Sequence, residues 1–268
     1  MIAFPGCKIN LGLYVTGKRA DGFHNIETCF YHIPWSDAVE IVPSGSFRLH
    51  IPGSSLEPDE QNTCTKAFRL LESRFGIPPV EAWLLKSVPH GAGLGGGSAD
   101  GAAMLGLLNA QFDLGLQPEQ LEEMALSLGS DCPFFIRPTP KLATGKGERF
   151  QPVDLSLKGY HIRIVKTSAS ISTAEAYRHV RIGTAAHDLR TTLEGPIEEW
   201  RHRLENVFEP YAFAQIPELP VIIRSMYDEG AVFAGMTGSG SAVFGLYDQE
   251  PPQRRYDPDY VVWSGELA

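Results

Sequence analysis

The most constraining feature of the sequence is a glycine-rich stretch that runs directly into an apolar helical pattern. Residues 91–97 contain five glycines, and alanines and leucines then recur at roughly helical spacing from Ala99 to Leu108. Glycine has no Cβ atom, so such a loop can adopt positive φ angles and bring backbone N–H groups close to a bulky anion. The unpaired N–H groups and the positive dipole end of the helix face the same point. The pattern therefore predicts a phosphate-binding loop at a helix N-terminus.

Three other interpretations of this loop are weaker. Residues 91–96 fit Gly-x-Gly-x-x-Gly, but a dinucleotide site needs a later strand that ends in an acid, and residues 113–121 predict a turn and a second helix instead. The P-loop motif requires Lys before the Ser or Thr, where this chain has Gly97 before Ser98. A flexible linker would be rich in Ser, Thr and charge, and would not run straight into an Ala/Leu-rich helix.

The composition limits the partners and the compartment. The 268 residues are 43% hydrophobic and carry a formal net charge of −9 without a basic cluster, which argues against nucleic acid and anionic membrane as partners. Lys8 interrupts the N-terminal apolar run and no long apolar window follows, so we expect a cytoplasmic protein without a membrane segment. Four cysteines without Cys-x-x-Cys spacing, and histidines without a zinc-binding pattern, predict neither a disulfide framework nor a zinc site.

The N-terminal segment predicts a strand that carries two polar side chains. Residues 2–15 alternate loosely between apolar and other residues, and Lys8 and Asn10 lie two apart. Successive side chains of a strand point to opposite faces, so these two share one face. For Lys8 alone, a solvated position at a sheet edge is an equally good interpretation. Residues 17–24 then predict a hairpin-like turn that ends in Phe23 and His24, and a lone His is usually structural.

The elements around the glycine loop can be predicted from periodicity and caps. A helix over residues 66–75 should be capped by Asn62 or Thr63, and a strand over 80–88 carries Lys86 into the loop. The helix after the loop should end near Gln111, and another should cover residues 118–128. Asp131 then lies between the end of that helix and a predicted Pro-Phe-Phe strand. A turn-capping role is the more common explanation for an Asp in such a position.

The second half of the chain predicts strands and helices around another glycine loop. We expect the boundary between the halves close to the glycine turn at residues 143–148, a strand at 160–165, and a capping box of Ser172 and Glu175 before a short helix. Further expectations are a helical outline at 188–208, a loop at 210–220, a helix at 221–228 and a strand at 242–247. The Gly/Ser loop at 235–241 could be a simple hairpin turn.

In this order the motifs resemble the GHMP kinase superfamily. Its three motifs have counterparts in the N-terminal strand, in Pro-x-x-x-Gly-Leu-Gly-Gly-Gly-Ser at residues 89–98 and in Gly-Met-Thr-Gly-Ser-Gly-Ser at 235–241. Within it, Arg-Ala-Asp-Gly-Phe-His at 19–24 and Gly-Ser-Asp-Cys-Pro-Phe-Phe at 129–135 are most similar to the family of 4-diphosphocytidyl-2-C-methyl-D-erythritol kinases. The resemblance covers essentially the whole chain. Two positions depart from the family pattern: Phe23 replaces the usual Tyr, and Ala242 stands where many relatives have Cys.

The resemblance implies an α+β, two-domain GHMP kinase fold. Its N-terminal half, residues 1–152, would be the ATP-binding domain and resemble ribosomal protein S5 domain 2. Its C-terminal half, residues 153–268, would be a ferredoxin-like α/β domain on the substrate side, with a cleft between the halves.

The resemblance also implies an activity, which is ATP-dependent phosphorylation of the 2-hydroxyl of 4-diphosphocytidyl-2-C-methyl-D-erythritol in non-mevalonate isoprenoid precursor biosynthesis. The implied catalytic residues are Lys8 and Asp131. The implied ATP-binding residues are Asn62, Lys86, Pro89, Gly91, Gly93, Leu94, Gly95, Gly96, Gly97 and Ser98. The implied substrate-binding residues are Asn10, Phe23, His24, Thr173, Tyr177, Gly238 and Ser239.

Mg²⁺ is expected to arrive with the nucleotide, because the sequence has no carboxylate cluster that suggests a protein cage, and we name no metal residue. The expected partners are the small-molecule substrate and ATP, with a chain that is a monomer or a weak homodimer. Three alternatives remain: a homoserine- or mevalonate-type kinase of the same superfamily, a catalytically silent binding protein of the same fold, and an RNA-binding relative. The net charge of −9 argues against the last of these.

Overall fold

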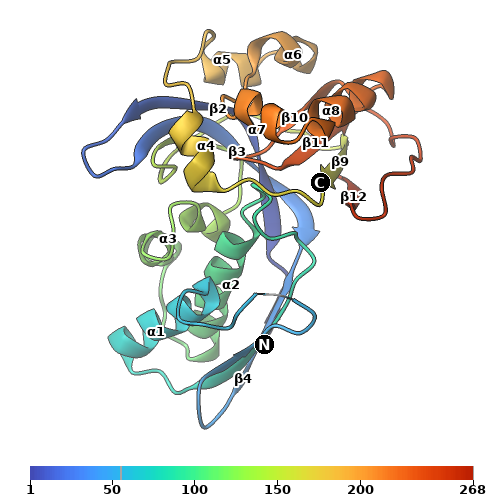
Figure 1. The fold of residues 1–268 in the computed structure, drawn as a ribbon. Helices are drawn as coiled ribbons and strands as arrows, with labels where there is room; N and C mark the ends of the chain where they lie inside the picture. The colour runs from blue at the N-terminus through green and yellow to red at the C-terminus, as the bar shows by residue number, and fades with distance from the viewer. Residues whose placement is uncertain (55, 268) are drawn as a thin grey trace. The chain divides into compact units, whose positions relative to one another are not determined.

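The computed structural model describes residues 1–54 and 56–267, and its ribbon is shown in Figure 1. The described strands form three four-stranded sheets, with helices between them in the chain, as expected for an α+β protein. The chain divides into two compact units. Unit 1 contains Met1–Cys7, Trp35–His90 and Gly95–Thr139, and unit 2 contains Lys8–Pro34, Gly91–Leu94 and the chain from Pro140 onward. Both units are therefore built from segments that are far apart in the sequence.

Unit 1 is a sheet with helices on one face. The sheet has the order β1-β4-β6-β5 and consists of β1 (Ile2–Ala3), β4 (Ala38–Pro43), β6 (Val80–Leu85) and β5 (Arg48–His50). The helices are α1 (Thr63–Phe75), α2 (Gly96–Gln111), α3 (Pro118–Leu126) and the 3₁₀-helix η1 (Cys132–Ile136). Val39 and Ile41 of β4 alternate with more exposed residues and pack with Ala82 and Leu84 of β6 against apolar side chains of α1, α2 and α3 (Figure 1).

The start and end of α1 follow from its sequence. Asn62 is the N-cap, and its side-chain oxygen accepts a hydrogen bond from the backbone N–H of Cys64 at 2.9 Å. The helix ends at Gly76, which adopts a φ of 61° that residues with a Cβ rarely take. The prediction of a cap at Asn62 or Thr63 is thus confirmed for Asn62.

Unit 2 contains two sheets. The first, in the order β2-β3-β7-β8, is made of β2 (Gly6–Lys18), β3 (His24–Ser36), β7 (Lys141–Gly145) and β8 (Arg149–Pro152). The first residues of β2, up to Cys7, and the last residues of β3, from Trp35, belong to unit 1. The second, in the order β10-β11-β9-β12, is made of β9 (His161–Lys166), β10 (Phe233–Met236), β11 (Ala242–Tyr247) and β12 (Val261–Glu266). All strand pairs of the second sheet are antiparallel.

The helices of unit 2 are short. They are α4 (Thr173–His179), α5 (Leu189–Leu193), the 3₁₀-helix η2 (Ile197–Glu199), α6 (Trp200–Arg203), α7 (Glu209–Gln215) and α8 (Glu218–Asp228). Apolar side chains of α7 and α8, including Ala212, Leu219 and Met226, pack with Val243 of β11 in one buried core. Figure 1 shows α7 and α8 beside β10 and β11.

Four local predictions differ from the structure, and the reason can be identified for the first two. The expected Pro-Phe-Phe strand is η1, because Pro133 fits the first turn of a helix and Phe134 is buried in unit 1. The loop expected at 210–220 contains α7 and the start of α8, since its prolines stand in first turns, where no N–H bond is lost. The expected helical outline at 188–208 is broken into α5, η2 and α6. Ser172 is the N-cap of α4 but makes no capping hydrogen bond through its side chain.

Within residues 1–54 and 56–267, no helix is both long enough and apolar enough to cross a membrane.

Candidate functional site

The glycine stretch forms a loop that ends in the first turn of α2, as predicted. Gly91, Gly93 and Gly95 adopt φ angles of 65°, 79° and 70°, and Gly95 is the N-cap of the helix. The N–H of Ala99 makes the first bond of the helix, to the Gly95 carbonyl at 3.0 Å. The N–H groups of the three residues before Ala99 have no acceptor within the helix, because the chain has not yet completed a turn. This turn carries no acidic side chain, so it presents positive potential to an anion.

The two glycine-rich loops of the sequence meet in unit 2. A Cβ atom on Gly93 would lie 2.2 Å from the carbonyl oxygen of Thr237, and one on Gly238 would lie 2.8 Å from the Cα of Gly93. The backbone N–H of Ala242 also donates to the carbonyl of Ala92 at 3.1 Å. Glycine is therefore required at both positions by close backbone approach as well as by positive φ. The loop at 235–241 is thus more than a hairpin turn.

Lys8 and Asn10 share one face of β2, which confirms the strand prediction. The Lys8 Nζ donates to Asn10 Oδ1 at 2.6 Å and to the Gly93 carbonyl at 2.9 Å. Asn10 Nδ2 donates to Thr28 Oγ1 at 2.9 Å. Lys8 is only 3% exposed and Asn10 only 4% exposed, so a solvated Lys at a sheet edge is the wrong interpretation. A buried ammonium is costly unless its donors are satisfied, and here two oxygens accept from it.

Thr237 completes this polar cluster. Its Oγ1 accepts from the backbone N–H of Asn10 at 3.0 Å and lies 3.2 Å from the Gly93 carbonyl, to which the hydroxyl can donate. The residue is fully buried. We call Lys8, Asn10, Gly93 and Thr237 the Lys8 cluster. The sequence offers one signal for Thr237, which is a polar β-branched residue inside a glycine loop, and that signal alone assigns no contact.

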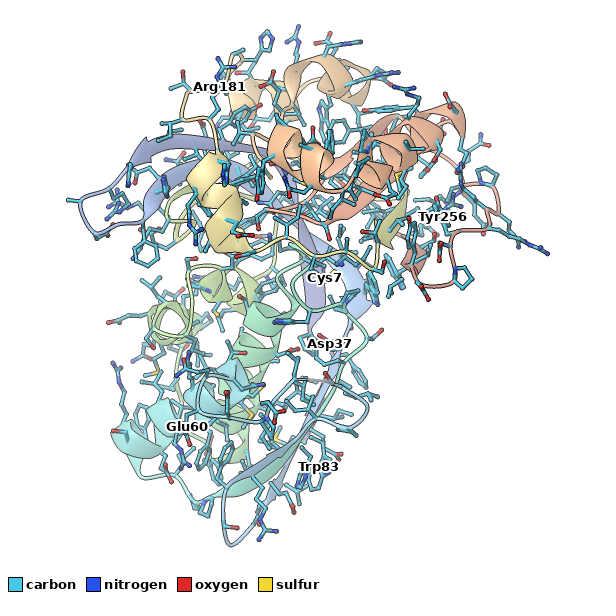
Figure 2. All side chains as sticks on the ribbon, viewed as in Figure 1. Cys7, Asp37, Glu60, Trp83, Arg181 and Tyr256 are labelled. Atoms are coloured by element: carbon cyan, nitrogen blue, oxygen red, sulfur yellow. The ribbon has the colours of Figure 1, made fainter. Side chains whose placement is uncertain are left out.

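Lys86 takes part in a second buried charge cluster, in unit 1. Its Nζ bonds to Asp37, labelled in Figure 2, and to Asp100 of α2 at 2.7 Å. Asp37 Oδ1 also accepts from the backbone N–H groups of Ser87 and Val88, at 2.6 and 2.8 Å. Burial raises the pKa of Asp100 to about 7, against the opposing effect of Lys86. The cluster ties the chain just before the glycine loop to the first turns of α2.

Asp37 and Asp100 could not be assigned from the sequence, because only the tertiary structure brings three separate segments together at Lys86. Asp100 follows Ser98 by two residues, yet nothing in the helical pattern shows that its carboxylate meets Lys86, which directly follows β6. The contact of Lys86 with ATP stays a prediction, and the structure adds a positioning role for its ammonium in unit 1.

Asp131 stands at the N-cap of η1 in unit 1, but its side chain makes no capping hydrogen bond. Ser130 Oγ approaches Asp131 Oδ1 at 3.4 Å, which is long for a strong bond. The carboxylate is half-buried. The turn-capping explanation of this Asp therefore has no support in the local geometry.

Residues predicted to bind the substrate form two pairs in unit 2. The rings of His24 and Tyr177 stack with centroids 5.0 Å apart and planes at 26°, and Tyr177 packs edge-on against Phe208. Thr173 Oγ1 and Ser239 Oγ lie 3.0 Å apart, so α4 and the loop after β10 are joined. Phe23 is 59% exposed at the turn between β2 and β3. Exposed aromatic faces of this kind can stack on a planar ring.

The other predicted residues are placed mainly by their backbone. Leu94 is buried and its carbonyl accepts from the N–H of Lys8 at 2.9 Å, within unit 2. The carbonyl of Gly97 accepts from Thr63 Oγ1 at 2.6 Å, which joins the first turns of α1 and α2 in unit 1. Pro89 lies in the segment between β6 and the glycine loop.

Comparison with known proteins is consistent along the whole chain. Residues 62–137 match the family model of the GHMP kinases N terminal domain, and residues 186–257 match that of the GHMP kinases C terminal domain. The chain is similar to 4-diphosphocytidyl-2-C-methyl-D-erythritol kinase of Parabacteroides distasonis, with 46% identity over 271 residues and 100% of each chain covered.

Solved structures show the same relationship. A crystal structure of 4-(cytidine 5'-diphospho)-2C-methyl-D-erythritol kinase matches with a TM-score of 0.73 and 32% identity, covering 92% of this chain and 90% of that one. Mevalonate kinase of Methanococcus jannaschii matches with a TM-score of 0.73 at 15% identity, covering 100% and 98%, which shows a shared fold alone. The predicted α+β GHMP kinase fold is confirmed by these matches. The chain belongs to the GHMP kinases and, within them, to the family of the 4-diphosphocytidyl-2-C-methyl-D-erythritol kinases.

Proposed function

We infer that this protein transfers the γ-phosphoryl group of ATP to the 2-hydroxyl of 4-diphosphocytidyl-2-C-methyl-D-erythritol, a step of non-mevalonate isoprenoid precursor biosynthesis. The observation that carries this conclusion is the identity of 46% to a kinase of that name, over the full length of both chains. The matches to kinases of the rival substrates have much lower sequence identity: 16% for a homoserine kinase and 15% for a mevalonate kinase. A silent binding protein is disfavoured by the buried, fully assembled Lys8 cluster.

We propose that the ATP phosphates bind the backbone N–H groups at the start of α2. The positive φ angles of Gly91, Gly93 and Gly95 and the absence of an acidic side chain in the first turn support this assignment. Pro89 and Leu94 would shape the loop through their backbone, while Asn62 and Lys86 would lie near the adenine. Mg²⁺ would neutralise charge on the phosphates when it arrives with the nucleotide.

In the proposed reaction, Asp131 accepts the proton of the substrate 2-hydroxyl as the oxygen attacks the γ-phosphorus and the bond to ADP breaks. Lys8 lowers the cost of the developing alkoxide by its charge. Asn10 orients the hydroxyl, since its amide is itself held by Lys8 and Thr28. Phosphoryl transfer through a loose transition state depends mainly on such positioning and charge neutralisation.

The diphosphocytidyl part of the substrate would bind in unit 2. The stacked His24 and Tyr177, with the exposed Phe23, offer planar faces for the cytosine ring. The hydroxyls of Thr173 and Ser239 and the backbone of Gly238 would bind the polar parts of the molecule. A cytoplasmic location, a monomer or weak homodimer, the absence of nucleic acid partners and a domain boundary at residues 152/153 remain proposals.

The function is tested by ADP release. Purified protein is supplied with ATP and Mg²⁺ and with one of three alcohols: 4-diphosphocytidyl-2-C-methyl-D-erythritol, homoserine or mevalonate. We expect ADP release that depends on the diphosphocytidyl alcohol alone, with the product phosphorylated at the 2-hydroxyl by ³¹P NMR. Preference for either smaller alcohol would support the alternative kinase, and no turnover with any of them would support a binding protein. Omitting Mg²⁺ in a parallel reaction tests its requirement.

Gly97 provides a test of the phosphate loop that does not disturb the fold. Its φ is not positive, it is exposed, and a Cβ there would meet nothing within 4 Å. We expect Gly97→Val to raise the KM for ATP by about tenfold or more, because the side chain would occupy the space expected for the phosphates. Gly95 and Gly96 are less suitable, since Gly95 has a positive φ and a Cβ on Gly96 would lie 3.1 Å from Val88.

Gly106→Val is the matched control for this variant. Gly106 lies on the same helix, and a Cβ there also meets nothing within 4 Å. Both variants exchange Gly for the same residue in α2, Val is no worse a helix former than Gly, and neither Cβ meets a neighbour, so both melting temperatures should change little and by similar amounts. An ATP KM that is the same in the two variants would contradict the assignment of the ATP phosphates to this turn.

A further inference from the structure

Strand β10 lies at the edge of its sheet, and half of its backbone groups face away from β11. The order β10-β11-β9-β12 places β11 on one side of β10 and no strand of that sheet on the other. Thr237 N–H donates to Ala242 O at 3.0 Å, and antiparallel pairs alternate between exchanging and not exchanging hydrogen bonds. In the register of these strands, the N–H and C=O groups of Ala234 and Met236 therefore point outward. Backbone groups buried in this way need other partners.

Three side chains supply these partners in place of a strand. Tyr227 Oη donates to the Ala234 carbonyl and accepts from the Ala234 N–H, both at 3.0 Å. Glu209 Oε1 accepts from the Met236 N–H at 3.0 Å. Asn206 Nδ2 donates to the Met236 carbonyl at 2.9 Å and to the Gly238 carbonyl, also at 2.9 Å. All four outward groups of the strand are satisfied.

Asn206 and Glu209 are themselves held in place by one tight turn before α7. The Asn206 Oδ1 accepts from the Phe208 N–H at 3.0 Å, and the Glu209 N–H donates to the Asn206 carbonyl at 2.9 Å. Asn206 is 7% exposed. Its amide orientation is therefore determined, with the oxygen used locally and the nitrogen directed at the loop after β10.

The contacts of Asn206 and Glu209 fall on both sides of Thr237. Met236 precedes Thr237 and Gly238 follows it, so the peptide groups on either side are fixed. Thr237 Oγ1 in turn bonds to the Asn10 N–H, and Asn10 Oδ1 accepts from Lys8 Nζ at 2.6 Å. A shift of Met236 or Gly238 therefore moves a bonded partner of the Lys8 cluster. Tyr227, by contrast, holds Ala234, which lies three residues before Thr237 and takes its two outward bonds from Tyr227.

We propose that Asn206 and Glu209 are positioning residues for phosphoryl transfer, which act through Thr237 on Asn10 and Lys8. The proposal rests on the proposed function, because it assigns these residues a part in that reaction. They do not touch the reacting atoms in this scheme. Their effect is to hold the loop after β10 at the distance from β2 at which Thr237 bonds to Asn10. A misplacement of about 1 Å of a group that orients the reactants can cost about 10²-fold in rate.

The protonation of Glu209 affects the choice of variant. Burial raises the pKa of Glu209 to about 7, opposed by the bond from Met236 and reinforced by the nearby Glu205. Arg201, Arg224 and Tyr227 line the same pocket of about 310 Å³ that borders the Glu209 side chain. A neutral carboxyl still accepts from the Met236 N–H through its C=O oxygen. Glu209→Gln therefore keeps the acceptor and Glu209→Leu removes it.

The test compares variants that remove a similar kind of edge contact at different distances from Thr237. Asn206→Asp keeps the size and the acceptor for Phe208 but replaces the donor with an oxygen that faces two carbonyls. Tyr227→Phe is the matched control, since it removes the two hydrogen bonds at Ala234. Glu209→Leu and Glu209→Gln form a loss and rescue pair, and Asn206→Ala replaces Asn206→Asp if the latter does not fold. Each is measured for melting temperature, kcat and both KM values, and for the backbone amide shift of Asn10 in ¹H–¹⁵N spectra without substrate.

We expect the Asn206 variant and Glu209→Leu to lower kcat by about tenfold or more at an ATP KM within about twofold, and to shift the Asn10 amide signal. Tyr227→Phe should lower the melting temperature comparably, with kcat and the Asn10 signal unchanged, and Glu209→Gln should retain most of kcat. Equal kcat in the Asn206 variant and Tyr227→Phe would overturn the proposal, as would an unmoved Asn10 signal. Wild-type protein that does not phosphorylate the diphosphocytidyl alcohol would overturn the proposed function instead. The Asn10 shift would still test whether Asn206 and Glu209 hold the loop that carries Thr237.

Discussion

Replacement of Asp131 by Asn is expected to lower kcat by about 10² or more, with smaller changes in both KM values and in the melting temperature. The substitution keeps the size and much of the hydrogen bonding of the side chain but removes its charge and basicity. Acid–base assistance in the transition state contributes about 10² to 10⁴ to rate, so its loss should appear in kcat. The small effect on stability is expected because Asn and Asp have nearly the same size and shape, so the packing around the side chain is kept.

Asp188 is the matched control for Asp131. It is the N-cap of α5, and its Oδ1 accepts from the backbone N–H of Thr191 at 2.8 Å. The Thr191 hydroxyl, which donates to the same oxygen at 2.7 Å, and this backbone bond hold the pKa of Asp188 below its usual value. Asp188→Ala should cost about 1 kcal/mol of stability and leave the kcat of the folded fraction unchanged. If Asp131→Asn behaves like this control, with near-normal turnover in the folded protein, the catalytic assignment of Asp131 is wrong.

Lys8→Met should also lower kcat by about 10² or more. Methionine fills the space of the Lys8 stem, but the charge and the bonds to Asn10 and the Gly93 carbonyl are lost. The developing charge on the substrate oxygen then lacks its cation, and Asn10 loses one of the partners that orient it. Steady-state kinetics and thermal unfolding of the same preparation separate this effect from a loss of folded protein.

A second buried lysine of unit 2 is the control for Lys8. Lys166 is 5% exposed, and its Nζ donates to the carbonyls of Thr167 and Ala169, both at 2.6 Å. Lys166→Met removes a buried, hydrogen-bonded ammonium that the proposed reaction does not use. It should reduce stability without the large loss in kcat. A loss of kcat in Lys166→Met as large as in Lys8→Met would show that burial of any ammonium in this unit, rather than its chemistry, determines activity.

The double variant of Lys8 and Asp131 tests whether the two residues act together. If they serve one proton transfer and one developing charge, the combined loss should be far smaller than the product of the two single losses, because residues that act as a unit are not additive. Multiplicative losses would mean that they contribute to separate events. In that case the scheme in which Lys8 supports the step that Asp131 begins is incorrect.

Much of the fold and part of the site could be predicted from local patterns in the sequence. Glycine spacing followed by helical periodicity predicted the loop and a helix ending near Gln111, and α2 is Gly96–Gln111. A period of two placed Lys8 and Asn10 on one face of a strand, and they are hydrogen-bonded there. The strand expected at 242–247 is β11 (Ala242–Tyr247). These features depend on neighbours within a few residues, which is the range over which periodicity and caps act.

The sequence by itself thus determined many of the elements, the glycine loop before α2 and the polar face of β2, and its motifs placed the chain in its family. The tertiary structure decided the partners. Asn10 meets Thr237, which is 227 positions later in the chain, and Lys86 meets Asp37 from 49 positions away. The contacts of Asn206 and Glu209 with the outward backbone groups of β10 depend on the position of that strand at the edge of its sheet, which the sequence does not show. The physical reason is that a buried polar group takes whichever partner the packed chain brings within about 3 Å, and no local period encodes that choice.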